Sequence, residues 1–355
     1  MSTIQQLPFQ GHLPASFFQI PKLIYQELPY QLVEDEAAVQ ALFAQEAERN
    51  DIVLFTDHAQ LRLVGIFPVG NSTAYFGFWE TVEEEELNRA AFKQLREAAR
   101  QRGYTQLLGP LNFSTYHAYR LRLGPPPSWQ HFDREPSNPG YYPGLLEKLG
   151  FAPQLTFESR LIEPATVPAV YQDKAALLAA LNGLPYEFLH LTPATWPEHE
   201  AELFELVHQV FSANPAYQRI PESQFRQLYN AQYAAKLCPH TSVLLREKAQ
   251  GRLVALSLCH PNYAPLKLGA TPPVFERDYP RLTRKTLLAK TVGVHPDFRN
   301  QQLMSYLGAY GMLSFRELYE QVIFCLMRSD NFSLHFTDGL PAEVAHYALF
   351  GLALR

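Results

Sequence analysis

One order of predicted elements, a β-hairpin followed by a strand, a helix and another strand, occurs twice along the chain. In the first half, apolar runs with strand or helix periods, bounded by polar turns, predict these elements at 51–56, 61–69, 72–81, 82–104 and 105–114. In the second half, the same patterns predict them at 241–247, 252–260, 287–294, 300–320 and 321–327. Strands that alternate with helices indicate an α/β protein, and two rounds within 355 residues indicate two domains.

The composition narrows the class of protein. Hydrophobic residues make up 47% of the chain, and the formal net charge of -5 disfavours a nucleic-acid-binding protein, which needs a basic face. The sequence has no run of about 18 apolar residues, so we expect no membrane span and no membrane partner. The N-terminus lacks a signal-peptide pattern, and the 3 cysteines cannot all pair within one chain. These features predict a cytoplasmic protein with reduced, mostly buried thiols.

The segment between the strand at 287–294 and the helix at 300–320 has the properties of an anion site. The first N–H groups of a helix are unpaired, and the helix dipole places partial positive charge there. Arg299 adds a fixed charge with several donors. The corresponding helix of the first half opens with four glutamates, Glu83 to Glu86, which suit the dipole and repel an anion. We therefore predict an anion site in the second half only.

The residues of this segment resemble a known family signature. A strand, the pattern V-x-P-x-x-R-x-x-G-x-G/A and a helix form the acyl-CoA signature of the GNAT N-acetyltransferase superfamily. Here Val294, Pro296 and Arg299 match it, while Gln302 and Met304 stand at the two small-residue positions. The segment "NPGYYPGLLEKLGF" (138–151) resembles another part of the GNAT pattern. With "GPLNFSTYHAYR" (109–120), it resembles a group of bacterial tandem GNAT-like proteins of unassigned activity.

The resemblance implies a fold and a domain organisation. We expect an α/β protein of two tandem GNAT-like domains, each a mixed, mostly antiparallel twisted sheet flanked by helices. The expected domains are 1–165, without a pyrophosphate loop, and 186–355, with an altered acyl-CoA loop, joined by a linker at 166–185 within a segment (162–185) that carries prolines and a short helix. The segment 345–354 is expected to form the last strand of the second domain.

The resemblance also implies an activity, which is acyl transfer from acetyl-CoA or another acyl-CoA to the amine of a small molecule or peptide. The residues expected at the cofactor are Val292, Val294, Arg299, Asn300, Gln301, Gln302, Leu303 and Met304. Gln302 and Met304 add bulk where the phosphates would lie. Asn331 matches the family's asparagine, and Asp338 stands where a tyrosine is expected. His335 is the nearest candidate for a general base, although a structural role is the simpler interpretation.

Polar and aromatic residues gather in the long loop of the first half. Candidate substrate-binding residues there are Asn112, Tyr116, His117, Tyr141 and Tyr142. They can line a substrate pocket, or they can pack the loop onto the sheet. The function also has two interpretations. Val294, Pro296, Arg299 and Asn331 favour an enzyme, whereas the missing glycines and the missing tyrosine favour a non-catalytic ligand-binding protein with a GNAT fold.

Overall fold

The protein was analysed as a computed structural model that describes residues 3–26, 28, 34–129, 131–170 and 174–354. The chain forms two compact units, and each consists of segments that are separated in the sequence. Unit 1 consists of Met1–Pro125, Pro136–Thr156 and His346–Arg355. Unit 2 consists of Pro126–Glu135 and Phe157–Ala345. None of the helices within the described residues is long and apolar enough to cross a bilayer.

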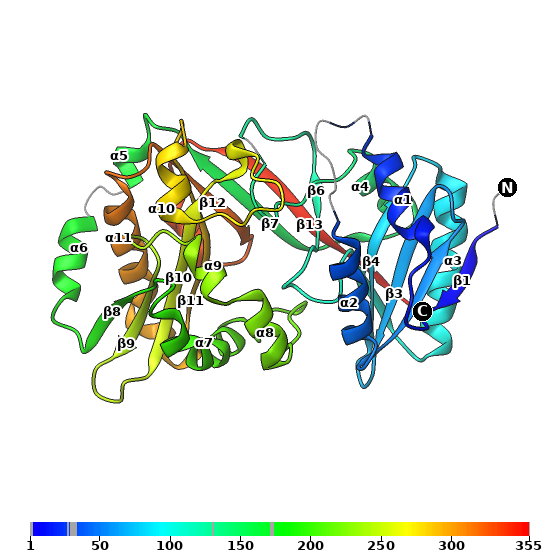
Figure 1. Ribbon diagram of the computed structural model, residues 1–355, viewed down its shortest axis with the longest axis horizontal. Coiled ribbons are helices and arrows are strands. Elements are labelled where there is room, and N and C mark those ends of the chain that lie inside the picture. Colours follow the sequence, from blue (N-terminus) through cyan, green and yellow to red (C-terminus); the bar gives the residue numbers. More distant parts are fainter. Residues whose placement is uncertain (1–2, 27, 29–33, 130, 171–173, 355) are drawn as a thin grey trace. The chain divides into compact units, whose positions relative to one another are not determined.

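The sheet of unit 1 is antiparallel except at one pair of strands (Figure 1). Its strands, in spatial order, are β1 (Gln5–Pro8), β2 (Asn50–Thr56), β3 (Leu61–Pro68), β4 (Thr73–Thr81), β5 (Gln106–Gly109) and β13 (Glu343–Ala353). β4 and β5 are parallel, and the short strand β6 (Leu121–Leu123) also pairs with β13. The predicted hairpin, third strand and helix of the first half are confirmed, and the strand predicted at 105–114 ends at Gly109.

The sheet of unit 2 repeats this order of pairings. Its strands, in spatial order, are β8 (Tyr186–His190), β9 (Val243–Glu247), β10 (Leu253–Pro261), β11 (Thr286–Val294), β12 (Gln321–Arg328) and β7 (Ala152–Ile162). Only β11 and β12 are parallel among these pairs. The two rounds of elements predicted from the sequence therefore build one sheet topology twice, as expected for two mixed, mostly antiparallel sheets.

The last strand of each sheet comes from the other half of the chain. β13 lies near the C-terminus, yet Phe350 to Ala353 pair with Gly109 to Gln106 of β5 in unit 1. β7 lies in the first half, yet Phe157 to Ile162 pair with β12 in unit 2. The expectation that 345–354 completes the second domain is therefore wrong, because the hydrogen bonds of this strand from His346 onward are made within unit 1. The units thus differ from the predicted ranges 1–165 and 186–355.

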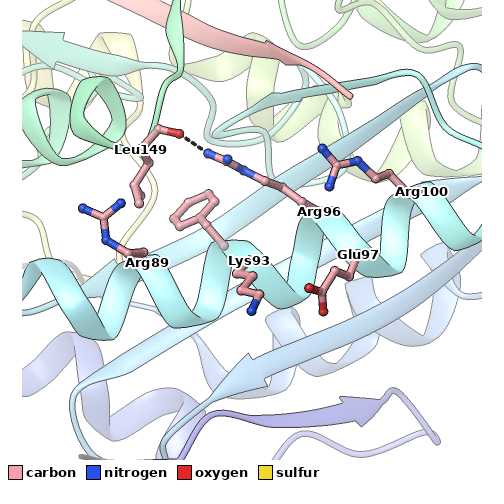
Figure 2. A pocket seen from close by; sticks show the side chains of 7 residues that line it. Arg89, Lys93, Arg96, Glu97, Arg100 and Leu149 are labelled. Atoms are coloured by element: carbon pink, nitrogen blue, oxygen red, sulfur yellow. Dashed lines mark hydrogen bonds between the residues drawn. The ribbon is translucent and has the colours of Figure 1, made fainter. Parts of the chain in front are cut away.

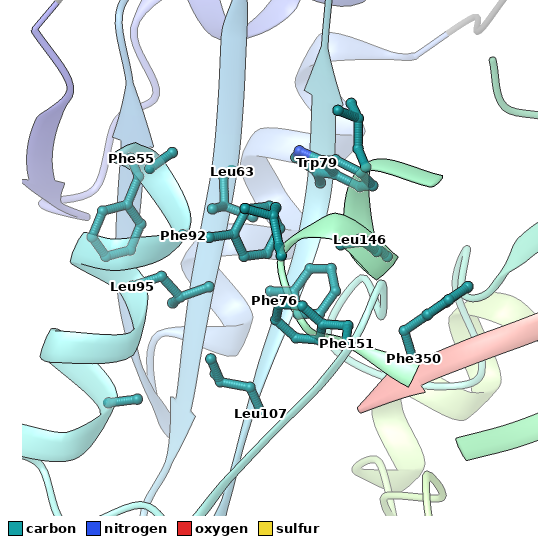
Figure 3. Close-up of a cluster of buried hydrophobic side chains, with 14 of the residues drawn as sticks. Phe55, Leu63, Phe76, Trp79, Phe92, Leu95, Leu107, Leu146, Phe151 and Phe350 are labelled. Carbon is teal, nitrogen blue, oxygen red and sulfur yellow. The ribbon is translucent and has the colours of Figure 1, made fainter. Parts of the chain in front are cut away.

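Helices cover both faces of the unit 1 sheet. α3 (Glu85–Gln101) and α4 (Tyr142–Lys148) pack on one face, where Phe76, Phe92 and Phe151 form part of the core (Figure 3). The ring centroids of Phe76 and Phe92 are 5.3 Å apart. Successive strand residues point to opposite faces. On the other face, the Arg62 side chain donates a hydrogen bond to the Phe17 carbonyl of α1 (Ala15–Ile24), and α2 (Glu36–Glu46) contributes Phe43 to an aromatic cluster.

In unit 2, α11 (Leu303–Phe315) and α7 (Trp196–Phe211) pack on opposite faces of the sheet. Val294 lies in the core cluster with Leu303 and Leu307 of α11, whereas Gly293 contacts Val210 of α7. The predicted linker contributes α5 (Val167–Val170) and α6 (Lys174–Leu181), and its residues 171–173 lie outside the described residues. The remaining helices are α8 (Glu222–Leu228), α9 (Ala231–Ala235), α10 (Phe275–Asp278) and the 3-10 helices η1 (Ala264–Leu266), η2 (Tyr279–Arg281), η3 (Pro296–Gln301) and η4 (Phe332–Thr337).

Candidate functional site

The parallel strands of unit 2 pair along only half of their length. β11 pairs with β12 from Thr286 to Ala289, and the ladder ends with the pair Ala289–Phe324. At the same point, the register of β11 with β10 shifts, so that Lys290 is the extra residue of a β-bulge. Beyond Lys290, β11 continues beside β10 alone among the strands that the structure describes. The two parallel strands therefore diverge at Lys290.

This divergence leaves one edge of β11 available for hydrogen bonding. The His295 N–H donates to the Val254 carbonyl at 2.8 Å, on the β10 side. Backbone N–H groups alternate in direction along a strand, so those of Val292 and Val294 point to the opposite edge. That edge carries no ladder partner beyond Ala289 among the described strands. An extended ligand with amide groups can pair with such an edge as an added strand does.

The loop after β11 leads directly into the start of α11. Residues 296–301 form η3, and Gln302 takes a left-handed conformation with φ 60° before α11 begins at Leu303. The Gln302 carbonyl accepts hydrogen bonds from the N–H groups of Ser305 at 3.0 Å and Tyr306 at 3.2 Å. The first turn of α11 has no acidic residue. The helix start therefore keeps the partial positive charge that attracts an anion.

The predicted cofactor residues have different surroundings. Arg299 donates from Nε to the Val294 carbonyl at 3.4 Å and from Nη2 to the Val210 carbonyl at 3.0 Å, so it ties the loop to α7. Gln301 accepts a hydrogen bond from the hydroxyl of Tyr186. The exposed residues of the group are Arg299, Asn300, Gln301 and Gln302, and Leu303 is buried. These residues form one continuous loop and helix start, next to the open edge at Val292 and Val294.

Met304 does not contribute the bulk that its position suggested. Its side chain is partly buried and packs against the cluster that contains Leu303 and Leu307. It therefore lies with the core and not over the exposed loop. Gln302 occupies the position where the family has its first glycine, and its left-handed backbone is the conformation that glycine adopts without strain. The loop thus keeps the backbone path while it changes the side chain.

A charged cluster in unit 2 was not predicted from the sequence. Asp133, in the segment Pro126–Glu135 that belongs to unit 2, places Oδ2 at 2.8 Å from Lys236 Nζ and at 3.6 Å from Lys290 Nζ. Lys290 also donates a hydrogen bond to the Asp133 backbone carbonyl. Lys290 is the bulge residue at which β11 and β12 diverge, so the cluster lies at the inner end of the open edge.

Burial and neighbouring charges shift the titration of this cluster. Desolvation opposes ionisation of Asp133, whose side chain is 45% exposed, but Lys290 and Lys236 hold its pKa well below the usual range. Burial lowers the pKa of Lys290 to about 8, although Asp133 opposes this shift. Burial, together with Lys236 and Lys290, lowers the pKa of His260 to about 3, so its imidazole is neutral at physiological pH. The cluster therefore combines a stable carboxylate with a lysine that titrates near neutrality.

The predicted catalytic residues lie together after β12. His335 is on η4, and its Nδ1 is 2.6 Å from Asp338 Oδ2. Asn331 precedes η4 and donates its backbone N–H to the Arg328 carbonyl at 2.9 Å. The side chain of His335 is 63% exposed, and Phe336 of the same segment packs beside Gly308 of α11. His335 thus has an accessible imidazole on a segment fixed to α11, and its catalytic role stays a prediction.

The predicted substrate residues all belong to unit 1, where Tyr116 and Tyr142 are buried and the other three are half-buried. Tyr142 is 1% exposed, donates its hydroxyl hydrogen to Glu80 Oε2 at 2.8 Å and accepts from the Thr81 N–H at 2.9 Å. The Tyr141 hydroxyl donates to the Thr81 carbonyl at 2.8 Å. Tyr116 is buried and His117 is half-buried in the turn after β5. Their predicted role in substrate binding stays a prediction.

Asn112 fills the divergence of the parallel strands in unit 1. β4 and β5 pair only from Thr73 to Tyr75, and the turn after β5 then enters the space beside β4. Asn112 Oδ1 accepts the Phe78 N–H at 2.7 Å, and the Leu111 N–H donates to the Phe76 carbonyl at 2.7 Å. The protein's own chain therefore satisfies the edge of β4 that corresponds to the open edge of β11.

Glu80 is a buried acid of unit 1 that the sequence pattern did not single out. It is 8% exposed and lies on β4 opposite Arg62, just beyond a register shift. Burial raises its pKa to about 7, although Arg62 and the hydroxyl of Tyr142 oppose this shift. Arg62 is itself bound by Glu34, with Nη2 at 2.8 Å from Oε1. A carboxyl of this kind can exchange a proton near neutral pH.

A cationic hollow lies along the outer side of α3 (Figure 2). Its lining residues are Arg89, Phe92, Lys93, Arg96, Glu97, Arg100 and Leu149. Arg96 donates a hydrogen bond to the Leu149 carbonyl, and burial together with Arg100 and Arg89 lowers the pKa of Arg96. The hollow offers positive charge, but it lies along the body of α3 and away from the divergence of the strands.

Comparisons with known proteins agree with the architecture. No protein-family model matches the sequence, and no curated protein matches it. Among solved structures, the chain is similar to a tandem GNAT protein from the clavulanic acid biosynthesis pathway, with a TM-score of 0.53 and 12% identity over 99% of both chains. It is also similar to a probable N-acyltransferase from Enterococcus faecalis V583, with a TM-score of 0.52 and 8% identity over 99% of this chain and 73% of that one. The chain therefore has the tandem GNAT fold.

Proposed function

We propose that the chain is an acyl-CoA-dependent N-acyltransferase, most simply an N-acetyltransferase, whose unit 2 binds the cofactor. The observation that carries the proposal is the open edge of β11 beyond Lys290, which leads to a helix start without acidic residues. The tandem GNAT fold supports the same function. Unit 1 combines a filled divergence with glutamates at the start of α3, so it does not offer an equivalent site.

The shape of an acyl-CoA fits this arrangement. Its diphosphate would lie at the first turn of α11, where N–H groups and the helix dipole favour negative charge. Its pantetheine arm has two amides, which can accept from the N–H groups of Val292 and Val294. From Val294 to Lys290 the strand rises about 13 Å, at about 3.3 Å per residue. The acyl group would then lie near the point of divergence.

The reaction is the direct attack of an amine on the thioester. The nitrogen lone pair forms a bond to the acyl carbon, the carbon–sulfur bond breaks, and the sulfur leaves as CoA. A base takes one proton from the amine, and a proton returns to the sulfur. His335 is the proposed base, and Asp338 beside its Nδ1 would orient the imidazole so that Nε2 accepts the proton. Asn331 would help to fix the start of this segment.

The test is a calorimetric titration of the full chain with acetyl-CoA. We expect Gln302→Glu to weaken binding by about 5- to 30-fold, because a carboxylate at the helix start repels the diphosphate with about 1–2 kcal/mol. Gln302 is exposed, so the substitution does not disturb the core. Gln250→Glu makes the same chemical change at another exposed position, in the turn between β9 and β10, and should leave the affinity unchanged.

The results of this titration distinguish an acyltransferase from a non-catalytic ligand-binding protein. Millimolar affinity or better, reduced by Gln302→Glu alone, supports the acyltransferase. If wild type does not bind acetyl-CoA at millimolar concentration, the loop is a relic and the chain is a non-catalytic ligand-binding protein with this fold. If both glutamate variants weaken binding equally, the cofactor lies elsewhere and the effect is one of net charge.

A further inference from the structure

The charged cluster of unit 2 occupies the place where an acceptor would meet the acyl group. Lys290 is the bulge residue opposite Cys259, and His260 follows Cys259 on β10. Asp133 joins Lys290 to Lys236, which precedes β9 and follows α9. Cofactor bound along the open edge of β11 would end beside these residues. The charges and hydrogen-bonding groups of these residues should therefore indicate which class of acceptor binds there.

Several cations surround one carboxylate in this cluster. Asp133 is one carboxylate shared by two ammonium groups, and Arg134 adds a third cation that acts on both Asp133 and Lys290. The neighbouring carboxylate of Glu135 is held by Trp129 Nε1 at 3.0 Å and lies 3.3 Å from His131 Nδ1. The side chains of Lys236 and Lys290 are each 16% exposed, so they lie just below the protein surface. Each ammonium group has three donors, so a carboxylate on a ligand can accept from both lysines beside Asp133.

His260 supplies a hydrogen-bond acceptor next to these cations. It is 3% exposed, and its Nδ1 lies 2.9 Å from the Pro261 carbonyl, so Nδ1 carries the hydrogen. Its Nε2 then presents a lone pair and is buried with no partner among the described residues. Buried polar atoms normally have a partner. An N–H donor on a ligand would satisfy Nε2.

We infer that the acceptor of unit 2 is a free amino acid, whose carboxylate is held by Lys236 and Lys290 and whose amine donates to His260 Nε2. This inference rests on the proposed acyltransferase function and specifies its substrate class. Ammonium groups bind carboxylates through charge-assisted hydrogen bonds. A peptide N-terminus and a lysine side chain carry an amine without an adjacent carboxylate, so they fit the cluster less well. Asp133 fixes the two lysines, and its stable ionisation makes it a poor base.

The test compares acceptors that differ only in the carboxylate. Alanine, phenylalanine and lysine are each assayed against their carboxamides with acetyl-CoA, by release of free thiol from the full chain. The amine of a carboxamide loses its proton more readily than that of the free acid, so amine reactivity alone favours the carboxamide. For the amino acids that are acylated best, we expect the kcat/KM of the free acid to exceed that of its carboxamide by about 10- to 100-fold. This factor corresponds to the loss of a charge-assisted hydrogen bond.

Substitutions of the lysines and of Asp133 should change the preference for free acids in opposite directions. Lys236→Met and Lys290→Met keep most of the length of the side chain and remove its charge, so each should reduce the acid preference to less than about threefold. Asp133→Asn removes the internal carboxylate that competes for the lysines, so it should keep or increase the preference. Thermal unfolding of each variant shows whether it folds. The inference is overturned if carboxamides are used as well as acids by wild type, or if the lysine variants keep the preference.

Failure of this inference is distinct from failure of the acyltransferase function. If acetyl-CoA binds and is turned over with amines regardless of their carboxylate, only the acceptor class is wrong. If acetyl-CoA does not bind, the same amino acids and carboxamides are titrated into the protein alone and followed by its thermal unfolding. Stabilisation by the free acids that Lys236→Met abolishes would still support the site. Equal stabilisation by both series, or none by either, would overturn it.

Discussion

The point where two parallel strands diverge is where units 1 and 2 differ most. In unit 1, Leu111 and Asn112 hydrogen-bond to β4 and fill the divergence of β4 and β5. In unit 2, the edge of β11 beyond Lys290 has no ladder partner among the described strands. Both sheets have the same order and the same directions of strands. The difference teaches that this topology creates a gap, while the loop after the second parallel strand decides whether a ligand can use it.

The two helix starts differ in the same sense. α3 begins with Glu85 and Glu86, which pair with Arg89 at 2.5 Å and 3.4 Å. α11 begins without an acidic residue and follows a left-handed Gln302. Each unit also has a buried titratable group, since burial raises the pKa of Glu80 in unit 1 to about 7 and lowers that of Lys290 in unit 2 to about 8. Unit 1 thus has a closed divergence, whereas unit 2 has an open strand edge followed by a helix start without acidic residues.

The largest expected effect concerns His335, which follows the second parallel strand of unit 2 as Asn112 follows that of unit 1. If His335 is the base, His335→Ala should lower turnover by about 10²- to 10⁴-fold. Acetyl-CoA affinity should stay unchanged, because the residue acts on the amine. Steady-state kinetics and calorimetry measure the two quantities. His12→Ala, at an exposed position of unit 1, is the matched control. Unchanged turnover in His335→Ala would assign this residue a structural role.

A substitution in unit 1 tests whether its divergence is closed. A Cβ on Gly77 would lie 2.3 Å from the Leu111 carbonyl oxygen and 2.9 Å from Asn112 Oδ1. Because the nearest atoms are backbone, Gly77→Ala should lower the free energy of unfolding by about 3 kcal/mol.

The control for Gly77→Ala is an alanine where no atom obstructs it. A Cβ on Gly144 in α4 would have nothing within 4 Å, so Gly144→Ala should raise stability by up to about 1 kcal/mol. Denaturant unfolding measures both variants. If Gly77→Ala is as stable as wild type, the loop after β5 is loosely held and the contrast between the units fails.

Local patterns in the sequence predicted most of the elements, but they did not predict that each sheet takes its last strand from the other half of the chain. The strands at 287–294 and 321–327 were recognised because apolar residues dominate them, and they appear as β11 and β12. The strand at 345–354 was also recognised, but its partner was not. β13 pairs with β5 across more than 230 residues of sequence, since Phe350 lies opposite Gly109. Nothing in the local pattern of a strand specifies so distant a partner.

The candidate site was predictable only where it is continuous in the sequence. The loop from Val294 to Met304 was found through its motif, whereas Asp133, Lys236 and Lys290 come from three distant segments. The segment with Asp133 matches no motif, and its lysine partners lie more than 100 residues away in the sequence. A lysine within an otherwise apolar strand, as Lys290 is in "LLAKTVGV", was the available signal.

A smaller effect should appear in the pH dependence of stability through Glu80 in unit 1. Its pKa is about 7 in the folded protein and 4.5 ordinarily, so the folded state retains a proton that the unfolded state releases between these values. Stability due to Glu80 therefore falls as pH rises from about 4.5 to 7 and stays low above pH 7. Glu80→Gln cannot ionise. It should match wild type near pH 4 and exceed it by about 2–3 kcal/mol at pH 8.

Denaturant unfolding at pH 4, 6 and 8 measures this difference. Glu97→Gln, at an exposed position of α3 in the same unit, is the matched control and should show no such dependence. A constant difference between Glu80→Gln and wild type at all three pH values would mean that Glu80 ionises normally. Unit 1 would then lack the closed, dry interior on which its contrast with unit 2 depends.

The smallest effect sharpens the comparison at the start of α11. Glycine inside a helix usually costs stability, but Gln302 precedes the helix with φ 60°. Relief of this left-handed strain, about 1–2 kcal/mol, should outweigh the added freedom of the unfolded chain, about 0.5–1 kcal/mol. Gln302→Gly should therefore raise the free energy of unfolding by about 0.5 kcal/mol and tighten acetyl-CoA binding a few-fold, because the ligand can approach the backbone.

Met304→Gly should instead destabilise by about 2 kcal/mol or more, because Met304 packs against the core. Unfolding and calorimetric titrations of both variants separate the two residues. Equal losses of stability would mean that Gln302 behaves as an ordinary helical residue, and the loop would then differ from the glycine turn of the GNAT signature in backbone as well as in side chain.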